Sequence, residues 1–221
     1  MTWLGGVNRQ ICQRSTGTSS ARWLPRSAAR QNGGAAMFVM KRLVIAESPS
    51  TRVEGNSAIT SRFMTNIAAP PFWRAALRGN HLADDVPVDR WQICRFTPPS
   101  HVMIEVGVAH AGHGGYDAPA DRKVSSVVVD FITPETDTSI WYFWGMARNF
   151  NVDDQALTET IRAGQSEIFG EDVGILEAQQ RNLAEQPSRH LMRLNIDMGG
   201  FEARRILERL VAEEQNDLLR A

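Results

Sequence analysis

The chain has 221 residues, of which 43% are hydrophobic, and its formal net charge is −1. This balance gives no general reason to expect contact with nucleic acid, and no apolar run approaches the ~18 residues of a membrane span. The two cysteines, Cys12 and Cys94, are far apart and lack the spacing of zinc ligands. We therefore expect no disulfide framework and a reducing, cytoplasmic location.

Charge is distributed unevenly along the chain. The segment from Met1 to Ala46 carries seven basic residues and no acid, and it includes a Ser- and Thr-rich run at residues 15–20. This composition is typical of a transit peptide or a basic arm, and it also fits a wrongly assigned start codon or an out-of-frame translation. We expect residues 1–42 not to pack, and one globular domain over residues 43–217.

The first part of this domain is predicted to be mainly strands. Loops are expected at Glu54-Gly55-Asn56 and over residues 80–87, a short helix at Pro70–Leu77, and a turn at residues 133–136 that joins the last two strands as a hairpin. The alternating or β-branched segments expected as strands are Leu43–Ala46, Ser57–Met64, Asp89–Phe96, His101–Ala109, Val124–Ile132 and Ser139–Ala147.

After residue 149 the apolar period becomes helical. Asp153 or Asp154 can cap a helix from Gln155 that runs to Gly170, or through it to Gln186. An extended segment, Arg189–Ile196, and a last helix, Phe201–Leu219, follow. Strands first and long helices afterwards indicate an α+β fold, in which a curved antiparallel sheet carries helices on one face.

Asp172 is the least expected residue of the long helix. It falls on a helical stripe whose other members are mostly apolar or small, at residues 157, 161, 164, 168, 175 and 179. A buried carboxylate needs a partner or a metal ion. Alternatively, Gly170 breaks the helix, and Glu171 and Asp172 are ordinary acids in the first turn of a second one.

His110 and His113 have a metal-compatible spacing, but their glycine-rich loop supplies no third ligand, which favours exposed loop histidines.

Several motifs stand in a characteristic order across residues 43–215. They are Trp91–Phe96 (WQICRF), Ile132–Thr138 (ITPETDT), Tyr142–Phe150 (YFWGMARNF), Glu171–Gln180 with its Glu-Asp pair, and Leu194–Glu208. Together they resemble the catalytic domain of the Rieske non-haem iron oxygenases, in particular the members of that family that demethylate aromatic ethers such as vanillate. The resemblance implies a helix-grip fold, in which the curved antiparallel sheet wraps a long C-terminal helix and leaves a pocket.

The resemblance also implies site residues. Asp172 matches the carboxylate that, with two histidines, holds a mononuclear non-haem Fe(II) ion in the family. Gln92, Asp130 and Gly164 match positions that line the substrate pocket in demethylating relatives. The family's [2Fe–2S] cluster is held by Cys-x-His and Cys-x-x-His motifs, and neither motif occurs in this sequence. The first histidine is His81, so the family's iron-binding His-(x)4-His pair has no match before the first strands.

Three functions follow as expectations. The first is the oxygenase component of an aromatic O-demethylase that acts on a methoxylated aromatic acid such as vanillate, served by a flavin- or ferredoxin-type reductase and assembled as a homotrimer. The second is a truncated, catalytically inactive remnant, and the third is a helix-grip module that binds an apolar or aromatic ligand without iron. Because one iron ligand cannot hold Fe(II) tightly, we expect negligible oxygenase activity from this chain alone.

Overall fold

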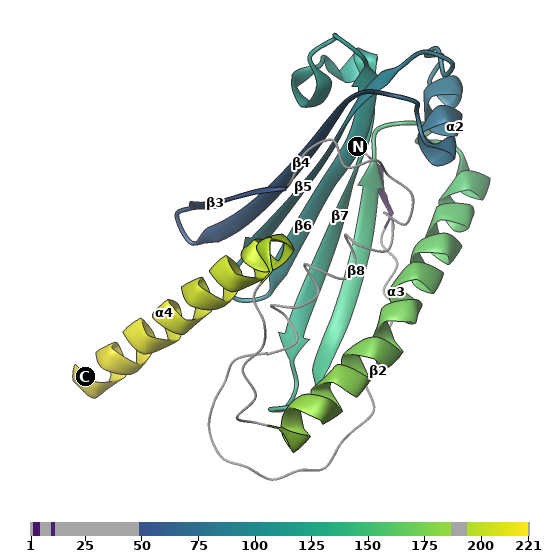
Figure 1. Cartoon of the computed structure of the whole chain (residues 1–221). Coiled ribbons are helices and arrows are strands. Elements are labelled where there is room, and N and C mark those ends of the chain that lie inside the picture. The colour runs from purple at the N-terminus through teal and green to yellow at the C-terminus, as the bar shows by residue number, and fades with distance from the viewer. Residues whose placement is uncertain (1, 5–9, 12–48, 187–193, 221) are drawn as a thin grey trace.

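The computed structural model describes residues 2–4, 10–11, 49–186 and 194–220 (Figure 1). The expected strand Leu43–Ala46 lies outside these residues, as does most of segment 1–42. Two short pieces of that segment, β1 (Thr2–Leu4) and β2 (Gln10–Ile11), pair with the last strand of the sheet. The domain boundary at residues 42–43 therefore stays a prediction.

Six longer antiparallel strands form the body of the sheet, and each pairs with the strand that follows it in the chain. The sheet order is β1-β8-β7-β6-β5-β4-β3, and β2 also pairs with β8. This arrangement confirms the expected antiparallel sheet and the hairpin before the helices. The strands are β3 (Ser50–Glu54), β4 (Ser57–Ile67), β5 (Val88–Thr97), β6 (His101–His110), β7 (Lys123–Pro134) and β8 (Ile140–Arg148).

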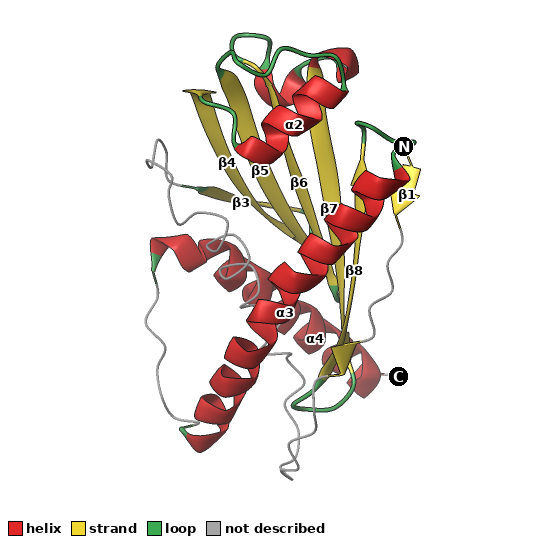
Figure 2. Cartoon of the chain, turned by 90° about the vertical axis from the view of Figure 1, so that its right-hand side faces the viewer, coloured by secondary structure: helices red, strands yellow, loops and turns green. Residues whose placement is uncertain are grey.

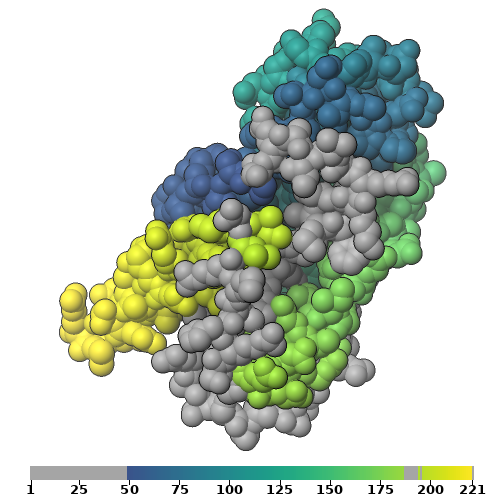
Figure 3. Space-filling model, in the orientation of Figure 1, coloured from purple at the N-terminus to yellow at the C-terminus, as the bar shows by residue number. Residues whose placement is uncertain are grey.

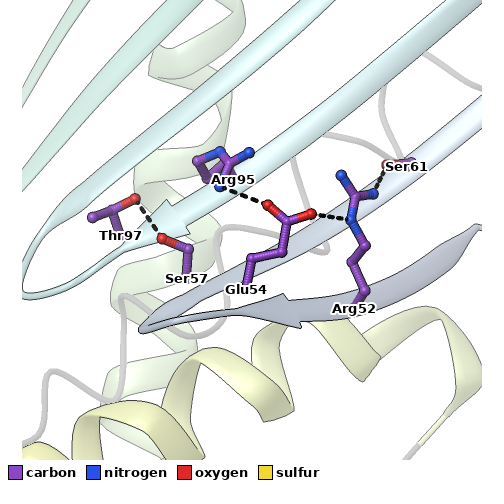
Figure 4. Close-up of polar contacts among 6 residues, drawn as sticks. All are labelled: Arg52, Glu54, Ser57, Ser61, Arg95 and Thr97. Atoms are coloured by element: carbon purple, nitrogen blue, oxygen red, sulfur yellow. Dashed lines mark hydrogen bonds and ion pairs between the residues drawn. The ribbon is translucent and has the colours of Figure 1, made fainter.

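The strand that precedes β4 is β3, a segment for which the sequence predicted no strand. Its sequence, STRVE, contains one large apolar residue, so it lacks the alternation that marks a half-buried strand. Polar contacts on the open face of the sheet join this edge strand to β4 and β5 (Figure 4). Glu54 accepts from Arg52 at 2.7 Å and from Arg95 at 3.5 Å, and Arg52 also donates to Ser61 Oγ at 3.2 Å.

The helices lie on one face of the sheet (Figure 2). They are the α-helices α2 (Pro71–Gly79), α3 (Gln155–Glu185) and α4 (Met198–Arg220). The chain also has short 3-10 helices, η1 (Gly115–Asp117), η2 (Ala120–Arg122) and η3 (Asn195–Asp197), and Tyr116 of η1 contacts Trp91 on the opposite face of the sheet. η3 replaces the end of the segment Arg189–Ile196, which was expected to be extended, so that prediction is wrong for residues 195 and 196. Of the described helices, none is both long and apolar enough to cross a bilayer.

Three apolar clusters fix the helices on this helix-covered face. Trp73 and Leu77 of α2 pack on Val88, Val108 and Val124. Residues 161 and 169 of α3 pack on Val128, Trp144 and Met146, and residues 203, 206 and 207 of α4 pack on residues 58, 96, 102 and 132. The strand residues of all three clusters share one face through the antiparallel register, so the helix-grip expectation is confirmed.

The last helix also contacts the beginning of the sheet. Arg209 of α4 donates to the Asn56 side chain in the β3–β4 turn at 2.6 Å, across 153 residues of sequence. Beyond this contact α4 extends past the rest of the described chain (Figure 3), and Leu218 and Leu219 at its end are exposed.

Arg148 joins the end of β8 to the beginning of α3. Its side chain is 2% exposed, and it donates to the carbonyls of Phe150, Asn151 and Asp154 at 2.7–3.0 Å and to Thr158 Oγ1 at 3.1 Å. Asp154 caps α3 by accepting from the Leu157 amide, as the sequence predicted. One guanidinium therefore sets the point at which the long helix leaves the sheet.

We expect Arg148→Met to lower the free energy of unfolding by about 3–5 kcal/mol, because three carbonyls and Thr158 Oγ1 lose a charged donor whose own side chain is buried. Arg162→Met is the matched control, since Arg162 is an exposed partner of Glu159 on the same helix and its loss should cost under ~1 kcal/mol. Urea unfolding followed by circular dichroism measures both. Equal losses in the two variants would contradict the structural role of Arg148.

Candidate functional site

Asp172 lies in the middle of α3, because the helix continues unbroken through Gly170. The interpretation of Asp172 as a first-turn acid is therefore wrong. The stripe that faces the sheet carries Thr158, Ile161 and Phe169, which are buried, and Asp172 follows Phe169 on it at a step of three. The expected stripe is displaced from this one: Ile168 and Ile175 are 37% and 55% exposed.

The Asp172 carboxylate is half-buried in the middle of the helix. Burial raises its pKa above the ordinary value, and the neighbouring charge of Glu171 raises it further. Within residues 49–186 and 194–220, no hydrogen bond or ion pair reaches this carboxylate. A raised pKa and the absence of a described partner are typical of a carboxylate that binds a proton, a cation or another ligand.

Tyr142 of β8 is hydrogen-bonded to a second acid, and it also feels the charge of Asp172. Its hydroxyl donates to Asp130 Oδ1 on β7 at 2.8 Å, and its ring meets the edge of Phe169 at a centroid distance of 5.7 Å. The pKa of Tyr142 is raised by burial, then by the charge and hydrogen bond of Asp130, and then by the charge of Asp172. The phenol therefore stays protonated, and it stands within the field of both carboxylates.

Asp130 is the more deeply buried of the two acids, at 5% exposure. Burial raises its pKa to about 6, against the opposing effect of the Tyr142 hydrogen bond. Burial, followed by the charge of Asp130, also raises the pKa of Cys94 to about 12, so this thiol is protonated and a poor nucleophile.

Trp144 completes an aromatic wall beside Asp130. The two residues are direct cross-strand partners, and the Trp144 ring lies 5.5 Å from that of Phe169. The Trp144 Nε1 donor is buried without a hydrogen-bond partner in the described part of the chain. The cluster of Asp130, Tyr142, Trp144, Phe169 and Asp172 thus combines an aromatic surface with an acceptor and an indole donor. We call it the acid–aromatic cluster.

The other two predicted residues lie elsewhere on the same side of the molecule. Gln92 is half-buried on β5, four residues along the strand from Phe96. Phe96 and Asp130 lie in the same row of cross-strand partners, because both pair with Val102 of β6. Gly164 is half-buried on α3, and a Cβ atom built there would meet nothing within 4 Å. The structure places Asp130 in hydrogen-bond contact with Tyr142, and the charge of Asp172 acts on the same phenol. No hydrogen bond joins Gln92 or Gly164 to these residues in the described part of the chain.

Sequence reasoning left Tyr142, Trp144 and Phe169 out of the site. The alternation of Trp141-Tyr142-Phe143-Trp144 places Tyr142 and Trp144 on one face, and this part of the signal was available. The sequence does not show which of the two pairs lies on the helix-covered face, because both pairs are aromatic. Phe169 was missed because Ile168 and Ile175 suggested a neighbouring stripe of the helix.

The donors around Asp172 do not fit a site with two histidines and one carboxylate. No three His, Cys, Asp or Glu side chains gather anywhere in the described ranges. His110 Nε2 bonds to the Ala83 carbonyl at 2.7 Å, and His113 Nδ1 to the Ala111 carbonyl at 3.2 Å, so this pair is held by its own loop. The described residues thus supply one candidate iron ligand.

A groove of about 490 Å³ lies away from the acid–aromatic cluster, between β3 and the beginning of α4. None of the predicted site residues lines it. Its lining residues are Pro49, Thr51, Arg52, Val53, Ile196, Met198, Glu202 and Arg205.

The raised pKa of Asp130 predicts a pH-dependent stability. The folded chain holds this proton more tightly than the unfolded chain, so deprotonation favours unfolding, and stability falls as the pH rises from about 4 to about 6. The loss corresponds to about 3 kcal/mol, since each pKa unit is worth ~1.4 kcal/mol. Asp130→Asn should remove this loss and be the more stable form at pH 7.

Urea unfolding between pH 4 and pH 7.5 measures this effect. Asp121→Asn is the control, because Asp121 is an exposed acid whose removal leaves the buried carboxyl in place. An Asp130→Asn variant with the same pH dependence as the parent chain would contradict the burial of a titrating Asp130.

Comparison with known proteins identifies the family of the chain. The sequence model of the vanillate O-demethylase oxygenase C-terminal domain matches residues 36–213. Two relatives are vanillate O-demethylase oxygenase subunits of Pseudomonas sp.. The subunit of strain HR199 / DSM 7063 is 70% identical over 172 residues, which are 77% of this chain and 49% of that protein. The subunit of strain ATCC 19151 is 73% identical over 172 residues, which are 77% of this chain and 52% of that protein. The chain therefore spans about half the length of the curated relatives it matches.

The fold has solved counterparts as well. A crystal structure of dicamba monooxygenase bound to 3,6-dichlorosalicylic acid matches with a TM-score of 0.69 at 23% identity, over 86% of this chain and 56% of that one. Another, with non-heme iron and dicamba, matches with a TM-score of 0.62 at 25% identity, over 79% of this chain and 50% of that one. The chain belongs to the family of the vanillate O-demethylase oxygenase C-terminal domain, as the sequence motifs suggested.

Proposed function

We propose that this chain is the substrate-binding part of an aromatic O-demethylase oxygenase, and that its ligand is a methoxylated aromatic acid such as vanillate. The acid–aromatic cluster carries this proposal, because its polar groups adjoin an aromatic surface on the helix-covered face. Family membership and the names of the two Pseudomonas relatives support the choice of reaction and substrate.

Each member of the cluster has a distinct task in this proposal. The rings of Trp144 and Phe169 contact the aromatic ring of the ligand, and the free Trp144 Nε1 donates to one of its oxygens. Asp130 accepts a hydrogen bond from a phenolic hydroxyl of the ligand, and Tyr142 orients Asp130. With a pKa of about 6, Asp130 is largely ionised at neutral pH and is then a strong acceptor.

Gly164 and Gln92 have supporting roles in the proposal. The open space at Gly164 leaves room for the ligand beside α3, and a larger side chain there would enter that space. Gln92 presents an amide to the same face of the sheet from β5, closer to α2 than the acid–aromatic cluster is.

The overall reaction of such an oxygenase consumes O2, two electrons and two protons, and it yields the phenol, formaldehyde and water. We propose that a flavin- or ferredoxin-type reductase supplies the electrons through a [2Fe–2S] cluster outside this chain, in a homotrimer located in the cytoplasm. The word "subunit" in the names of the relatives supports an assembly of several components.

Iron would supply the oxidising chemistry, with Asp172 as its carboxylate ligand. Because the described residues provide one ligand of three, no step of the reaction is assigned to this chain alone. Its own residues bind and orient the aromatic ligand.

Vanillate binding is expected to depend on the space at Gly164. We expect Gly164→Leu to weaken vanillate binding at least tenfold in titration calorimetry. Gly174→Leu is the matched control, since Gly174 lies on the same helix, is exposed, and likewise has no neighbour within 4 Å of a built Cβ atom. Both changes replace glycine in a helix and should raise helix stability by a similar ~1 kcal/mol.

Three outcomes of the vanillate titrations test the proposed site. Binding lost in Gly164→Leu and kept in Gly174→Leu supports the proposed site, and equal affinity in both variants removes Gly164 from it. Absence of vanillate binding to the parent chain would contradict the proposal as a whole.

Iron loading is expected to be weak. After anaerobic incubation with Fe(II) and desalting, we expect well under one iron per chain in the parent, because one carboxylate competes poorly with water. Asp172→Ala should lower the residual iron, whereas Glu171→Ala, which removes the exposed neighbouring acid, should not. Stoichiometric iron that depends on Asp172 would instead show that the chain supplies a complete site.

A further inference from the structure

The groove between β3 and the beginning of α4 presents apolar side chains to solvent, and we call it the β3–α4 groove. It has a volume of about 490 Å³. Val53 lines it from β3, and Ile196 and Met198 line it from the beginning of α4 and the turn before it. These three large apolar side chains are 41–53% exposed. Exposed apolar side chains that gather in one groove are typical of a surface that binds a partner.

The charged residues of the β3–α4 groove are mainly basic. Its lining contains Arg52, Arg205 and a single acid, Glu202, so its formal charge is +1. Arg52 pairs with Glu54 and Arg205 with Glu202, but both arginine side chains are more than half exposed. Exposed ion pairs of this kind are weak, so the two arginines can also attract the acids of a partner. The groove therefore suits a segment that is both apolar and acidic.

The end of α4 is such a segment. Val211, Leu218 and Leu219 stand at positions i, i+7 and i+8 and thus share one side of the helix. Leu218 and Leu219 are 72% and 86% exposed. Glu214 and Asp217 are exposed acids on the same two turns. This is the pattern with which an amphipathic helix enters an apolar groove.

The helix end cannot reach the groove of its own chain. Leu218 is 13 residues beyond Arg205 on one continuous helix, which corresponds to about 20 Å. In Figure 1 the C-terminal end of α4 points away from the sheet, and Figure 3 shows it as a free projection. The groove must therefore receive its occupant from elsewhere, and a second copy of the chain offers this same helix end.

We propose that residues 211–220 of α4 dock into the β3–α4 groove of a second copy of this chain. The leucines of one copy cover Val53, Ile196 and Met198 of the other, and the acids of the helix end face the groove's arginines. The contact is heterologous, because one copy contributes the helix end and the other the groove. It goes beyond the proposed function, since it requires neither an aromatic ligand nor iron.

Sedimentation velocity of the full chain tests the contact. The parent should associate as its concentration rises. Leu218→Ser combined with Leu219→Ser removes the apolar anchors, and Arg205→Glu places an acid in the groove, so each variant should weaken association by about tenfold or more. Arg181→Glu is the control, because it makes the same charge change on the exposed side of α3 and should associate like the parent.

A mixture of the two variants tests the direction of the contact. The Arg205→Glu variant keeps an intact helix end, and the double serine variant keeps an intact groove. An equal mixture should therefore form dimers at concentrations at which each variant alone is monomeric. Monomers in the mixture would overturn the proposal, because a head-to-tail contact needs one intact surface from each partner.

Thermal unfolding shows that the variants still fold. All three changed side chains are exposed, so at high dilution each variant should melt at the temperature of the parent. The melting temperature of the parent should rise with protein concentration, because association stabilises the folded state, and that of the variants should not.

Two further results would overturn the proposal. One is a parent chain that stays monomeric at every concentration, and the other is association that is unchanged in either variant. Failure of the proposed function is distinguishable from both. Arg205→Glu should bind vanillate like the parent, and a parent that associates without binding vanillate would contradict only the proposed function.

Discussion

The contact of Phe169 with Tyr142 and Trp144 is the interaction on which the candidate site depends. It packs the middle of α3 against β8, and it thereby brings Asp172, one helical turn further on, toward the Tyr142–Asp130 hydrogen bond. Arg148 defines where the helix begins, and Phe169 defines which of its stripes faces the sheet. Without both contacts the part of α3 that carries Asp172 would not be held beside β8 and the Tyr142–Asp130 hydrogen bond.

Much of the fold could be predicted because its strands alternate and its long helix has a clear cap. The hairpin of β7 and β8, the Asp154 cap and the placement of helices after strands were visible in local patterns. β3 could not be predicted, because an edge strand held by exposed polar side chains has no apolar period. The stripe of α3 was misjudged because residues 168 and 169 are both large and apolar, and only packing on Trp144 decides between them.

The site was predictable to a smaller degree. Asp130 and Asp172 were identified from family resemblance, and their roles remain proposals. The phenol that donates to Asp130 could not be found from sequence, because a hydrogen bond between adjacent strands depends on register.

The pairing of each long strand with its successor has a consequence for how the chain acquires its structure. From β3 to β8 every ladder joins neighbours in sequence, so the sheet can grow strand by strand as a meander with short loop closures. The contact of Arg209 with Asn56 spans almost the whole domain. Closure of α4 over β3 and β4 therefore requires the sheet to exist first, and until then the apolar side chains of the first hairpin stay in water.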